Sequence, residues 1–321
     1  MRSLILLLLF IQQIDAKVIT WPFVFDYVAA VNISIGTPAQ TIPIHLVITG
    51  DYPSLVVRDK AVGIGYDNNS SSTFVQTGNY QDIHNEKVGI AGTENFVIAN
   101  TVIESGKPFG IIHRNYYEYS KVGGSLGFSQ PTDGSTSFVQ SILNEVDNQV
   151  VVFSYDSPSL TTGTVTFGGL DAARCDSNWI NVPQVAPSSL NSNQWGVSIG
   201  EFSYGKYTYD KPGTAFFHIE DPEVFIPFSY SKKILDTLNA YNEFEVPCDN
   251  TVEFVFTIGQ LEIRLTPEDY LTPSDNLDSC YLNIIFTVNE DEFIFGTSVF
   301  KKWCLSLDYE HSTVGFAQRL Y

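Results

Sequence analysis

Two polar turns, each directly after an apolar run, carry residues whose types could do chemistry. The first run, "HLVITGD", ends at Asp51, and the second, "TAFFHIED", contains His218 and ends at Asp221. A polar turn between buried strands can hold a reactive side chain, and carboxylates and imidazoles transfer protons readily. Later in each half comes an apolar pair followed by Gly, in "GGSLGFS" and "FIFGTSVF". This faint internal repeat predicts two lobes whose equivalent turns face each other across a cleft.

Both aspartates also have a simpler explanation as ordinary turn residues. Asp is favoured in turns, where its side chain faces solvent or caps the local backbone. A metal site at the two turns would have only three candidate ligands, so we predict neither a metal nor a cofactor. The remaining histidines share no metal-like spacing, and we interpret them as surface or hydrogen-bonded polar residues: His45, His84, His113 and His311.

The elements that must position these turns are short strands. Runs rich in β-branched and aromatic residues are separated by Gly, Pro, Asn and Asp, which predicts strands. The clearest runs are "HLVI", "NFVIANTVI", "QVVVFSY", "GTVTFGGL", "VEFVFTI", "QLEIRL", "YLNIIFTV" and "EFIFGTSVF". Only "TSFVQSILNEV" and "SYSKKILDTLNAY" show helical spacing, and Ser231 fits the N-cap of the second helix. The sequence therefore predicts a mostly β fold with few, short helices.

Composition limits the class of protein and its partners. The chain has 321 residues, of which 44% are apolar and 14% aromatic, so it can bury a large core. It carries 36 acidic and 17 basic residues, a net charge of −19. Such an anion repels nucleic acids and anionic membrane surfaces, and we predict neither as a partner.

The first sixteen residues, "MRSLILLLLFIQQIDA", have the layout typical of a secretory signal peptide. Arg2 precedes a short apolar run, and a polar stretch ends at Ala16. We predict that residues 1–16 are removed and that the mature chain begins near Lys17. No later run is long enough to span a bilayer. We expect a secreted, extracellular protein, with a lysosomal or vesicular destination as the alternative.

Secretion makes the four cysteines interpretable as a disulfide framework, with three possible pairings. Cys248 and Cys280 lie 32 residues apart and flank a strand-like region, so they can close a loop in one half. Cys175 would then pair with Cys304, or these two remain buried free thiols.

Secretion also makes the three glycosylation sequons meaningful. Asn68 and Asn69 begin overlapping sequons in the polar stretch "YDNNSSST", and we expect one of them to be glycosylated. Asn32 begins a third sequon within a predicted strand, where we expect lower accessibility.

Several segments together resemble the pepsin-like aspartic peptidase family, peptidase family A1. They are "YVAAVNISIGTPAQTIPIHLVITG", "GGSLGFS", "VVVFSYDSPSLTTGTVTFGGLD", "LTPEDYL" and "FIFGTSVFKKWCLSLDYEHSTVGFAQ", in the family's order. The resemblance covers nearly all of residues 17–321. It implies two β-barrel-like lobes, about 17–185 and 186–321, with an interlobe sheet and a deep cleft. It also implies the Cys248–Cys280 disulfide. The Cys175–Cys304 pair resembles a disulfide that some family members have.

The resemblance implies a catalytic pair of facing aspartates, one in each of two Asp-Thr-Gly turns. One is protonated and one ionised, and together they activate a water. In this sequence the first turn begins with Ile48 and the second with His218, so neither position holds a carboxylate. Asp51 and Asp221 each lie three residues later, where the family has Ser or Thr.

Supporting parts of the family pattern differ as well. The family's tryptophan after the first turn falls on Leu55 or Val56, and the flap tyrosine falls on Tyr80 or Asp82. We therefore predict a secreted, catalytically inactive monomer whose cleft binds an extended peptide or protein segment. One alternative is an active endopeptidase that uses Asp51 and Asp221 as a displaced acid pair. The other is a structural glycoprotein with a closed cleft.

Overall fold

The computed structural model describes the following residues: 17–26, 28–48, 54–56, 63–81, 87–104, 109–112, 121–130, 138–156, 160–185, 194–219, 221–274 and 278–320. Residues 1–16, the predicted signal peptide, lie outside them. The fold is mostly β with several sheets, which confirms the predicted fold class.

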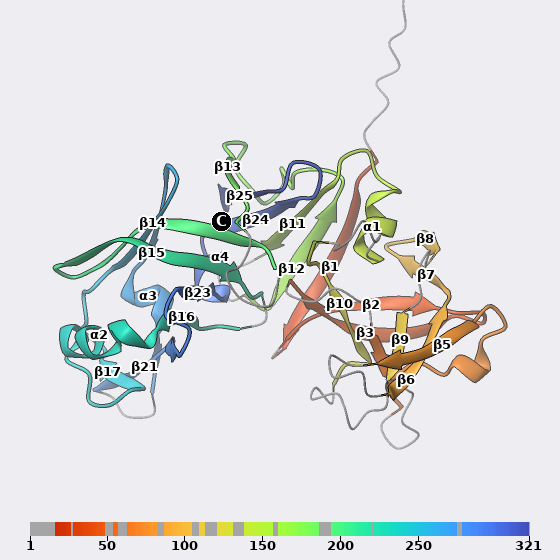
Figure 1. Ribbon diagram of the computed structural model, residues 1–321, viewed down its shortest axis with the longest axis horizontal. Coiled ribbons are helices and arrows are strands. Elements are labelled where there is room, and N and C mark those ends of the chain that lie inside the picture. Colours follow the sequence, from red (N-terminus) through yellow and green to blue (C-terminus); the bar gives the residue numbers. More distant parts are fainter. Residues whose placement is uncertain are drawn as a thin grey trace, which may run out of the picture.

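Two large sheets and one small sheet make up the described fold (Figure 1). The largest runs, in spatial order, through β13 (Ile180–Pro183), β25 (Thr313–Gln318), β24 (Trp303–Asp308), β11 (Val150–Tyr155), β12 (Thr162–Phe167), β1 (Ile19–Asp26), β2 (Val28–Ile35), β3 (Gln40–Val47), β10 (Gly124–Gly127), β4 (Ser54–Val56), β9 (Phe109–Ile112), β6 (Lys87–Thr93) and β5 (Val75–Gln81), while β7 (Asn95–Ile98) pairs with β2 and β8 (Thr101–Glu104) with β7.

The second sheet contains β19 (Leu261–Leu265), β18 (Phe254–Ile258), β14 (Gly196–Tyr204), β15 (Tyr207–Phe217), β23 (Glu292–Phe295), β16 (Val224–Pro227) and β22 (Ile284–Thr287). The small sheet contains β17 (Glu245–Pro247), β21 (Ser279–Leu282) and β20 (Leu271–Pro273). In Figure 1 the second sheet lies at the left, β5, β6 and β9 lie at the right, and β11, β12, β24 and β25 lie between them. The last two strands thus return to the sheet in which the chain began.

Alternating burial explains why these runs form strands. In β19, Leu261, Ile263 and Leu265 are buried, whereas Glu262 and Arg264 are exposed. Successive side chains of a strand point to opposite faces, so this pattern buries one face and leaves the other in water. The buried faces join one extended hydrophobic core.

The described helices are short: α1 (Phe138–Leu143), α2 (Ser231–Leu238), α3 (Pro267–Tyr270) and α4 (Thr297–Phe300), with the 3-10 turns η1 (Asn68–Ser70) and η3 (Phe228–Tyr230). α1 and α2 lie in the two segments with helical spacing. The predicted N-cap of α2 was one residue too late, because η3 runs directly into the helix and Tyr230 takes the cap position. α3 was not predicted, although Thr266 and Asp269 form a capping box around Pro267.

The predicted internal repeat is present in the strand order. β3 pairs in parallel with β10, which pairs antiparallel with β4, which pairs in parallel with β9. β15, β23, β16 and β22 repeat this series with the same directions. The ends of β3 and β15 are therefore equivalent places in two copies of one unit.

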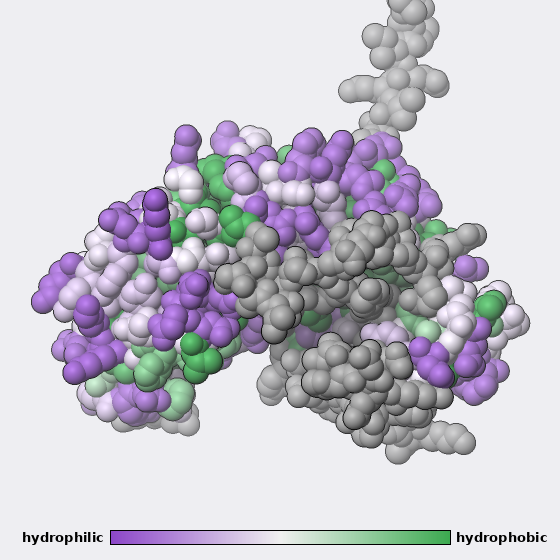
Figure 2. Space-filling view, in the orientation of Figure 1, coloured by the Kyte–Doolittle hydropathy of each residue, from purple (hydrophilic) through white to green (hydrophobic). Residues whose placement is uncertain are grey.

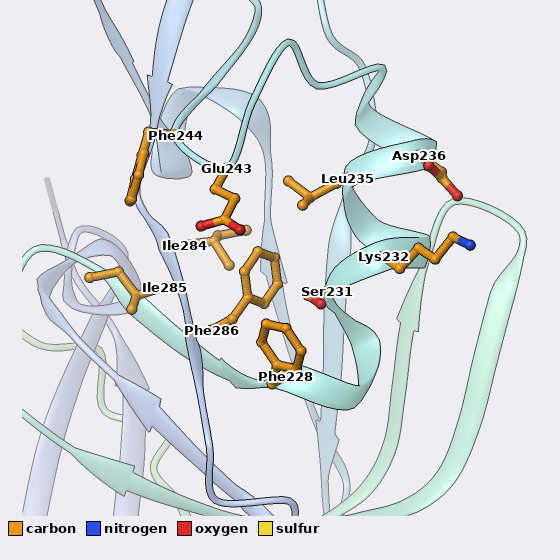
Figure 3. Close-up of a pocket in the computed structure, with 10 residues that line it drawn as sticks. All are labelled: Phe228, Ser231, Lys232, Leu235, Asp236, Glu243, Phe244, Ile284, Ile285 and Phe286. Atoms are coloured by element: carbon orange, nitrogen blue, oxygen red, sulfur yellow. The ribbon is translucent and has the colours of Figure 1, made fainter.

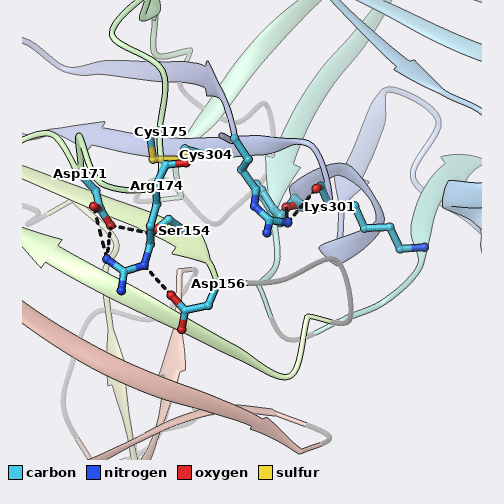
Figure 4. The surroundings of a disulfide bond; sticks show 9 residues. Ser154, Asp156, Asp171, Arg174, Cys175, Lys301 and Cys304 are labelled. Atoms are coloured by element: carbon cyan, nitrogen blue, oxygen red, sulfur yellow. Dashed lines mark hydrogen bonds and ion pairs between the residues drawn. A yellow bond between two sulfur atoms is a disulfide. The ribbon is translucent and has the colours of Figure 1, made fainter. Parts of the chain in front are cut away.

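Both predicted disulfides are present in the structure. Cys175–Cys304 joins the segment after β12 to β24, and Cys248–Cys280 joins the end of β17 to β21. Beside the first, Arg174 binds the carboxylates of Asp156 and Asp171 (Figure 4). This bond therefore reinforces the part of the large sheet that lies between the two repeats.

The sequons lie at the surface to different degrees. Asn69 is exposed and Asn68 half-buried in η1. Asn32 lies in β2, as predicted, but it is exposed because it falls on the outward face of the strand. The expectation that Asn32 is poorly accessible was therefore wrong.

Among the described residues, no helix is long and apolar enough to cross a bilayer.

Candidate functional site

The candidate site lies at the two equivalent strand ends. Ile48 directly follows β3, and its side chain is fully buried, at 0% exposure, in the hydrophobic core. His218 directly follows β15, and its backbone N–H donates to the carbonyl of Phe295 at 3.0 Å. In the first repeat, the N–H of Phe128 donates to the carbonyl of Val47 at 2.9 Å. The parallel strands thus fix both turns through main-chain bonds.

His218 and Asp221 form a close pair. Nδ1 of His218 lies 2.7 Å from Oδ2 of Asp221, and the two side chains are 22% and 35% exposed. Asp221 is the second-repeat acid that the sequence singled out. Asp51, its counterpart, lies outside the described residues, as do Thr49, Gly50 and Glu220. Of the two acids in the alternative of a displaced acid pair, the structure therefore describes only Asp221, and the carboxylate of Asp221 contacts the imidazole of His218.

A tight backbone approach holds Asp221. Its carbonyl accepts a hydrogen bond from the N–H of Thr297 at 2.6 Å. A Cβ added to Gly296 would lie 2.3 Å from the same carbonyl oxygen and 2.1 Å from that of Glu223. Real Cβ atoms do not come so close, so only Gly fits at position 296. Gly296 is the glycine of "FIFGTSVF", one of the two apolar-Gly segments of the internal repeat. Because it has no side chain, the backbone at Gly296 can pass directly beside the turn that carries Asp221.

His45, in the middle of β3, is part of the same region. Its side chain is 4% exposed, and burial lowers its pKa from 6.5 to about 4. The negative charge of Asp221 opposes this shift, so the first repeat approaches the second here. The surface alternative for His45 was therefore wrong. The apolar run around it, "IPIHLVI", was the signal that could have shown its burial.

A second carboxyl group lies close to Asp221. Burial raises the pKa of Glu223, and the charge of Asp221 raises it further. The region thus combines two acids, His218 and the buried His45. The described His, Cys, Asp and Glu side chains nevertheless form no group of three or more arranged to hold a metal ion.

The second turn is tied to the sheet between the repeats. The hydroxyl of Tyr155 in β11 donates to the carbonyl of Ile219 at 2.9 Å. The Tyr155 ring packs edge-on against Phe23 of β1, with centroids 5.2 Å apart. Ile219 itself is fully buried. The turn that carries His218 is therefore anchored in the core by its apolar neighbour.

β5 and β6 form the hairpin that corresponds to the predicted flap. The ring of Tyr80 packs directly on Gly110 of β9. A Cβ added to Gly110 would lie only 2.7 Å from this ring. Asp82, the other candidate for the flap tyrosine position, lies outside the described residues. Leu55, one of the two candidates for the family tryptophan position, is fully buried in β4.

A largely apolar groove of about 400 Å3 lies between α2 and β22 (Figure 3). Phe228, Phe244 and Ile285 line it with exposed side chains, and Phe244 is 64% exposed. Figure 2 shows hydrophobic residues beside strongly hydrophilic ones on this lobe, near the positions of α2 and β16 in Figure 1.

Strand pairing connects this groove to the candidate site. Ile285 pairs with Phe225 of β16, and paired residues share a face of the sheet. The ring of Phe225 lies 6.4 Å from that of His218, centroid to centroid. The groove could not be predicted from the sequence, because its aromatic residues come from three distant segments.

Two repeated β units that meet at paired turns define the class of bilobal, pepsin-like folds. Residues 27–319 match the family described as eukaryotic aspartyl protease, and the chain belongs to this family.

Three relatives illustrate the range of similarity. Over 328 residues the chain is 23% identical to aspartic protease 17 of Caenorhabditis elegans, which covers 91% of this chain and 83% of the relative. It is 20% identical over 250 residues to the aspartic-type endopeptidase ctsD of Aspergillus fumigatus, covering 72% of this chain and 51% of the relative. It is 25% identical over 230 residues to secreted aspartic protease 10 of Candida albicans, covering 68% and 48%. The match thus spans about half the length of the two fungal relatives.

Proposed function

We propose that this chain is a secreted pepsin-like protein without peptidase activity, which binds an extended peptide segment along its cleft and the apolar groove between α2 and β22. The observation that carries the proposal is the pair of equivalent strand ends. Where the family resemblance implies two aspartates, the chain has the buried Ile48 and the Asp-bonded His218.

The chemistry explains why these residues do not replace an acid pair. Aspartic catalysis requires one ionised and one protonated carboxyl group that share a water. An isoleucine side chain neither accepts a proton nor binds water. His218 can accept a proton, but its Nδ1 is engaged with Asp221, and no carboxylate stands at the equivalent position of the first repeat.

Peptide binding is the function that the remaining surface supports. Exposed aromatic and aliphatic side chains that gather around a groove usually mark a binding site. Phe228, Phe244 and Ile285 gather in this way, and Phe225 connects them to the paired turns. The three relatives described above carry names of proteases, whose substrates are polypeptides.

Other parts of the proposal rest on supporting observations. Two disulfides and the relative named as secreted support export, with residues 1–16 as the signal peptide. We place the lobe boundary near residues 185 and 186, between β13 in one sheet and β14 in the other. The chain acts as a monomer, with Asn32 and one of the overlapping pair Asn68 and Asn69 as its glycosylation sites.

Binding to an immobilised library of unstructured peptides tests the proposal. The mature protein should retain peptides that contain large apolar side chains, and Phe244→Ser should weaken this retention at least about tenfold. Val102→Ser is the matched control, because Val102 is also an exposed apolar residue but lies on β8 in the other lobe. Equal retention by both variants would show that the groove does not bind the peptide.

A further inference from the structure

A second hollow, which we call the sheet pocket, lies on the large sheet at β13, β25, β24 and β11, which are neighbours near the top of Figure 1. Its volume is about 330 Å3, and Ser306 of β24 lines it. The side chain of Ser306 points away from Leu305 and Leu307, which belong to the same hydrophobic core as Ile48. The sheet pocket therefore lies on the face of the sheet that is turned away from this core. It shares no lining residue with the apolar groove.

A row of paired residues forms the floor of the sheet pocket. Ser306 pairs with Gly315 of β25, and Gly315 pairs with Asn181 of β13, so the three lie side by side on one face. A Cβ added to Gly315 would lie 2.2 Å from Oγ of Ser306 and 2.4 Å from Oδ1 of Asn181. The same position is 3.2 Å from Cε3 of Trp179. Glycine at position 315 therefore lets a hydroxyl, an amide and an indole converge over one point of the sheet.

The indole of Trp179 is held in place by the protein. Trp179 is half-buried and packs against a small buried cluster that contains the disulfide between Cys175 and Cys304. Its remaining surface lines the sheet pocket together with Leu170, which is 51% exposed. The sheet pocket thus has an apolar wall beside its polar floor.

Side-chain hydrogen bonds also fix the loops around the floor. Oδ1 of Asp308 accepts the backbone N–H of His311 at 2.8 Å and that of Glu310 at 3.0 Å. Oδ2 of Asp308 lies 2.9 Å from Nδ1 of His311. Just before β11, Nδ2 of Asn148 donates to the carbonyl of Gly168 at 2.9 Å. A ligand would therefore find these loops already ordered, which lowers the entropic cost of binding.

The lining groups exclude several classes of ligand. Asp308 and Glu310 belong to the lining of a chain with a net charge of −19, which disfavours an anion. His311 already engages the carboxylate of Asp308, and the described His, Cys, Asp and Glu side chains form no group arranged to hold a metal ion. A wholly apolar ligand would cover the hydroxyl of Ser306 and the amide of Asn181 without replacing their bonds to water. A neutral and polar ligand fits best.

The combination of an indole with hydroxyl and amide groups indicates a sugar. A pyranose ring has C–H groups on its faces, which suit an aromatic surface, and hydroxyl groups around its edge. Serine hydroxyl and asparagine amide groups both donate and accept hydrogen bonds, as sugar hydroxyls require. The volume falls within the range of small-molecule sites. We propose that the sheet pocket binds a neutral pyranose sugar, with a C–H face on Trp179 and hydroxyl groups on Ser306 and Asn181.

Saturation-transfer NMR and titration of the mature protein test this inference. The neutral probes are the methyl glycosides of glucose, galactose, mannose and N-acetylglucosamine. At least one should bind with a Kd in the millimolar range or below. Glucuronic and galacturonic acid should bind at least about tenfold more weakly than that glycoside, because their carboxylates meet the charges of Asp308 and Glu310.

Variants locate the bound sugar. Trp179→Ala should raise the Kd at least about tenfold, and Asn181→Ala about fivefold because it removes one neutral hydrogen bond. Gln318→Ala is the matched control for Asn181→Ala, since Gln318 is an exposed amide at the last position of β25 and does not line the sheet pocket. Phe244→Ser, which alters the apolar groove, should leave sugar binding unchanged, so this test is independent of peptide binding.

The NMR signal of the Trp179 indole N–H, assigned by its loss in Trp179→Phe, gives a second measurement. It should shift on addition of the bound glycoside, and it decides the question together with Asn181→Ala if Trp179→Ala fails to fold. Free sugars and the ends of glycoprotein glycans share this chemistry, so released neutral N-glycans of the high-mannose and galactose-terminated types are titrated as well. Binding of a glycan at least about tenfold tighter than the glycoside would identify a glycan end as the ligand, and equal affinity would identify a free sugar.

Three results would overturn the inference. The first is the absence of binding by all four glycosides and both glycans. The second is binding that Trp179→Ala and Asn181→Ala leave unchanged. The third is an equal loss of affinity in Gln318→Ala or Phe244→Ser, which would place the sugar outside the sheet pocket.

Discussion

The buried His45 should make the protein acid-labile in a measurable way. Burial lowers its pKa from 6.5 to about 4 in the folded state. Between these values the unfolded chain binds a proton that the folded chain does not, so stability falls as the pH decreases. The full shift of about 2.5 pKa units corresponds to about 3 kcal/mol. By linkage, the loss relative to neutral pH is about 2 kcal/mol at pH 5 and about 3 kcal/mol at pH 4.

Urea unfolding of the wild type and of His45→Gln, at matched pH values between 7.5 and 4, isolates this contribution. Many carboxylates also titrate in this range, so the useful quantity is the difference between the two proteins at each pH. The wild type should lose about 3 kcal/mol more than His45→Gln between neutral pH and pH 4. Parallel stability curves for the two proteins would refute the assignment of acid lability to His45.

Three further predictions concern the disulfides, the glycans and the paired turns. Replacing Cys248 and Cys280 by Ser should lower the free energy of unfolding by up to about 4 kcal/mol in denaturant titrations, because the bond closes a 32-residue separation; an unchanged midpoint would contradict this. Mass spectrometry of enzymatically deglycosylated, secreted protein should find modification at the exposed Asn69 rather than the half-buried Asn68, and the reverse result would count against the surface described for η1. Ile48→Asp combined with His218→Asp should restore little or no peptidase activity, since residue 48 is fully buried and Asp221 adds like charge; robust cleavage by this double variant would show that the turns were still preorganised.

Much of the architecture could be predicted from the sequence because strand signals are local. The alternation in "QLEIRL" and the helical spacing around Ile234 each correspond to one element. The run "NFVIANTVI" was instead two strands, β7 and β8, joined at Ala99 and Asn100, both with positive φ. Its turn lacks the Asn-Gly or Asp-Gly pair that usually marks a two-residue hairpin.

The candidate site could be predicted only in part. Ile48 and His218 could be identified from the sequence because each stands where the family resemblance implies the aspartate of a short Asp-Thr-Gly turn. The burial of His45, the effect of the Asp221 charge on its pKa, and the apolar groove all depend on segments that are distant in the chain. Sequence periodicity carries no information about such contacts, because they arise only when sheets pack. The same limit applies to α3 and α4, which are too short for helical spacing to show.

The central claim is that the paired turns no longer support peptide hydrolysis. The most direct test incubates the mature protein with a mixed peptide library across roughly pH 2–7, which spans the pKa values of carboxylates and imidazoles. New peptide termini are counted by mass spectrometry, and Asp221→Asn is assayed in parallel. We predict no more cleavage by the wild type than by this variant at any pH. Cleavage by the wild type that Asp221→Asn abolishes would contradict the claim and would assign Asp221 to an active acid pair.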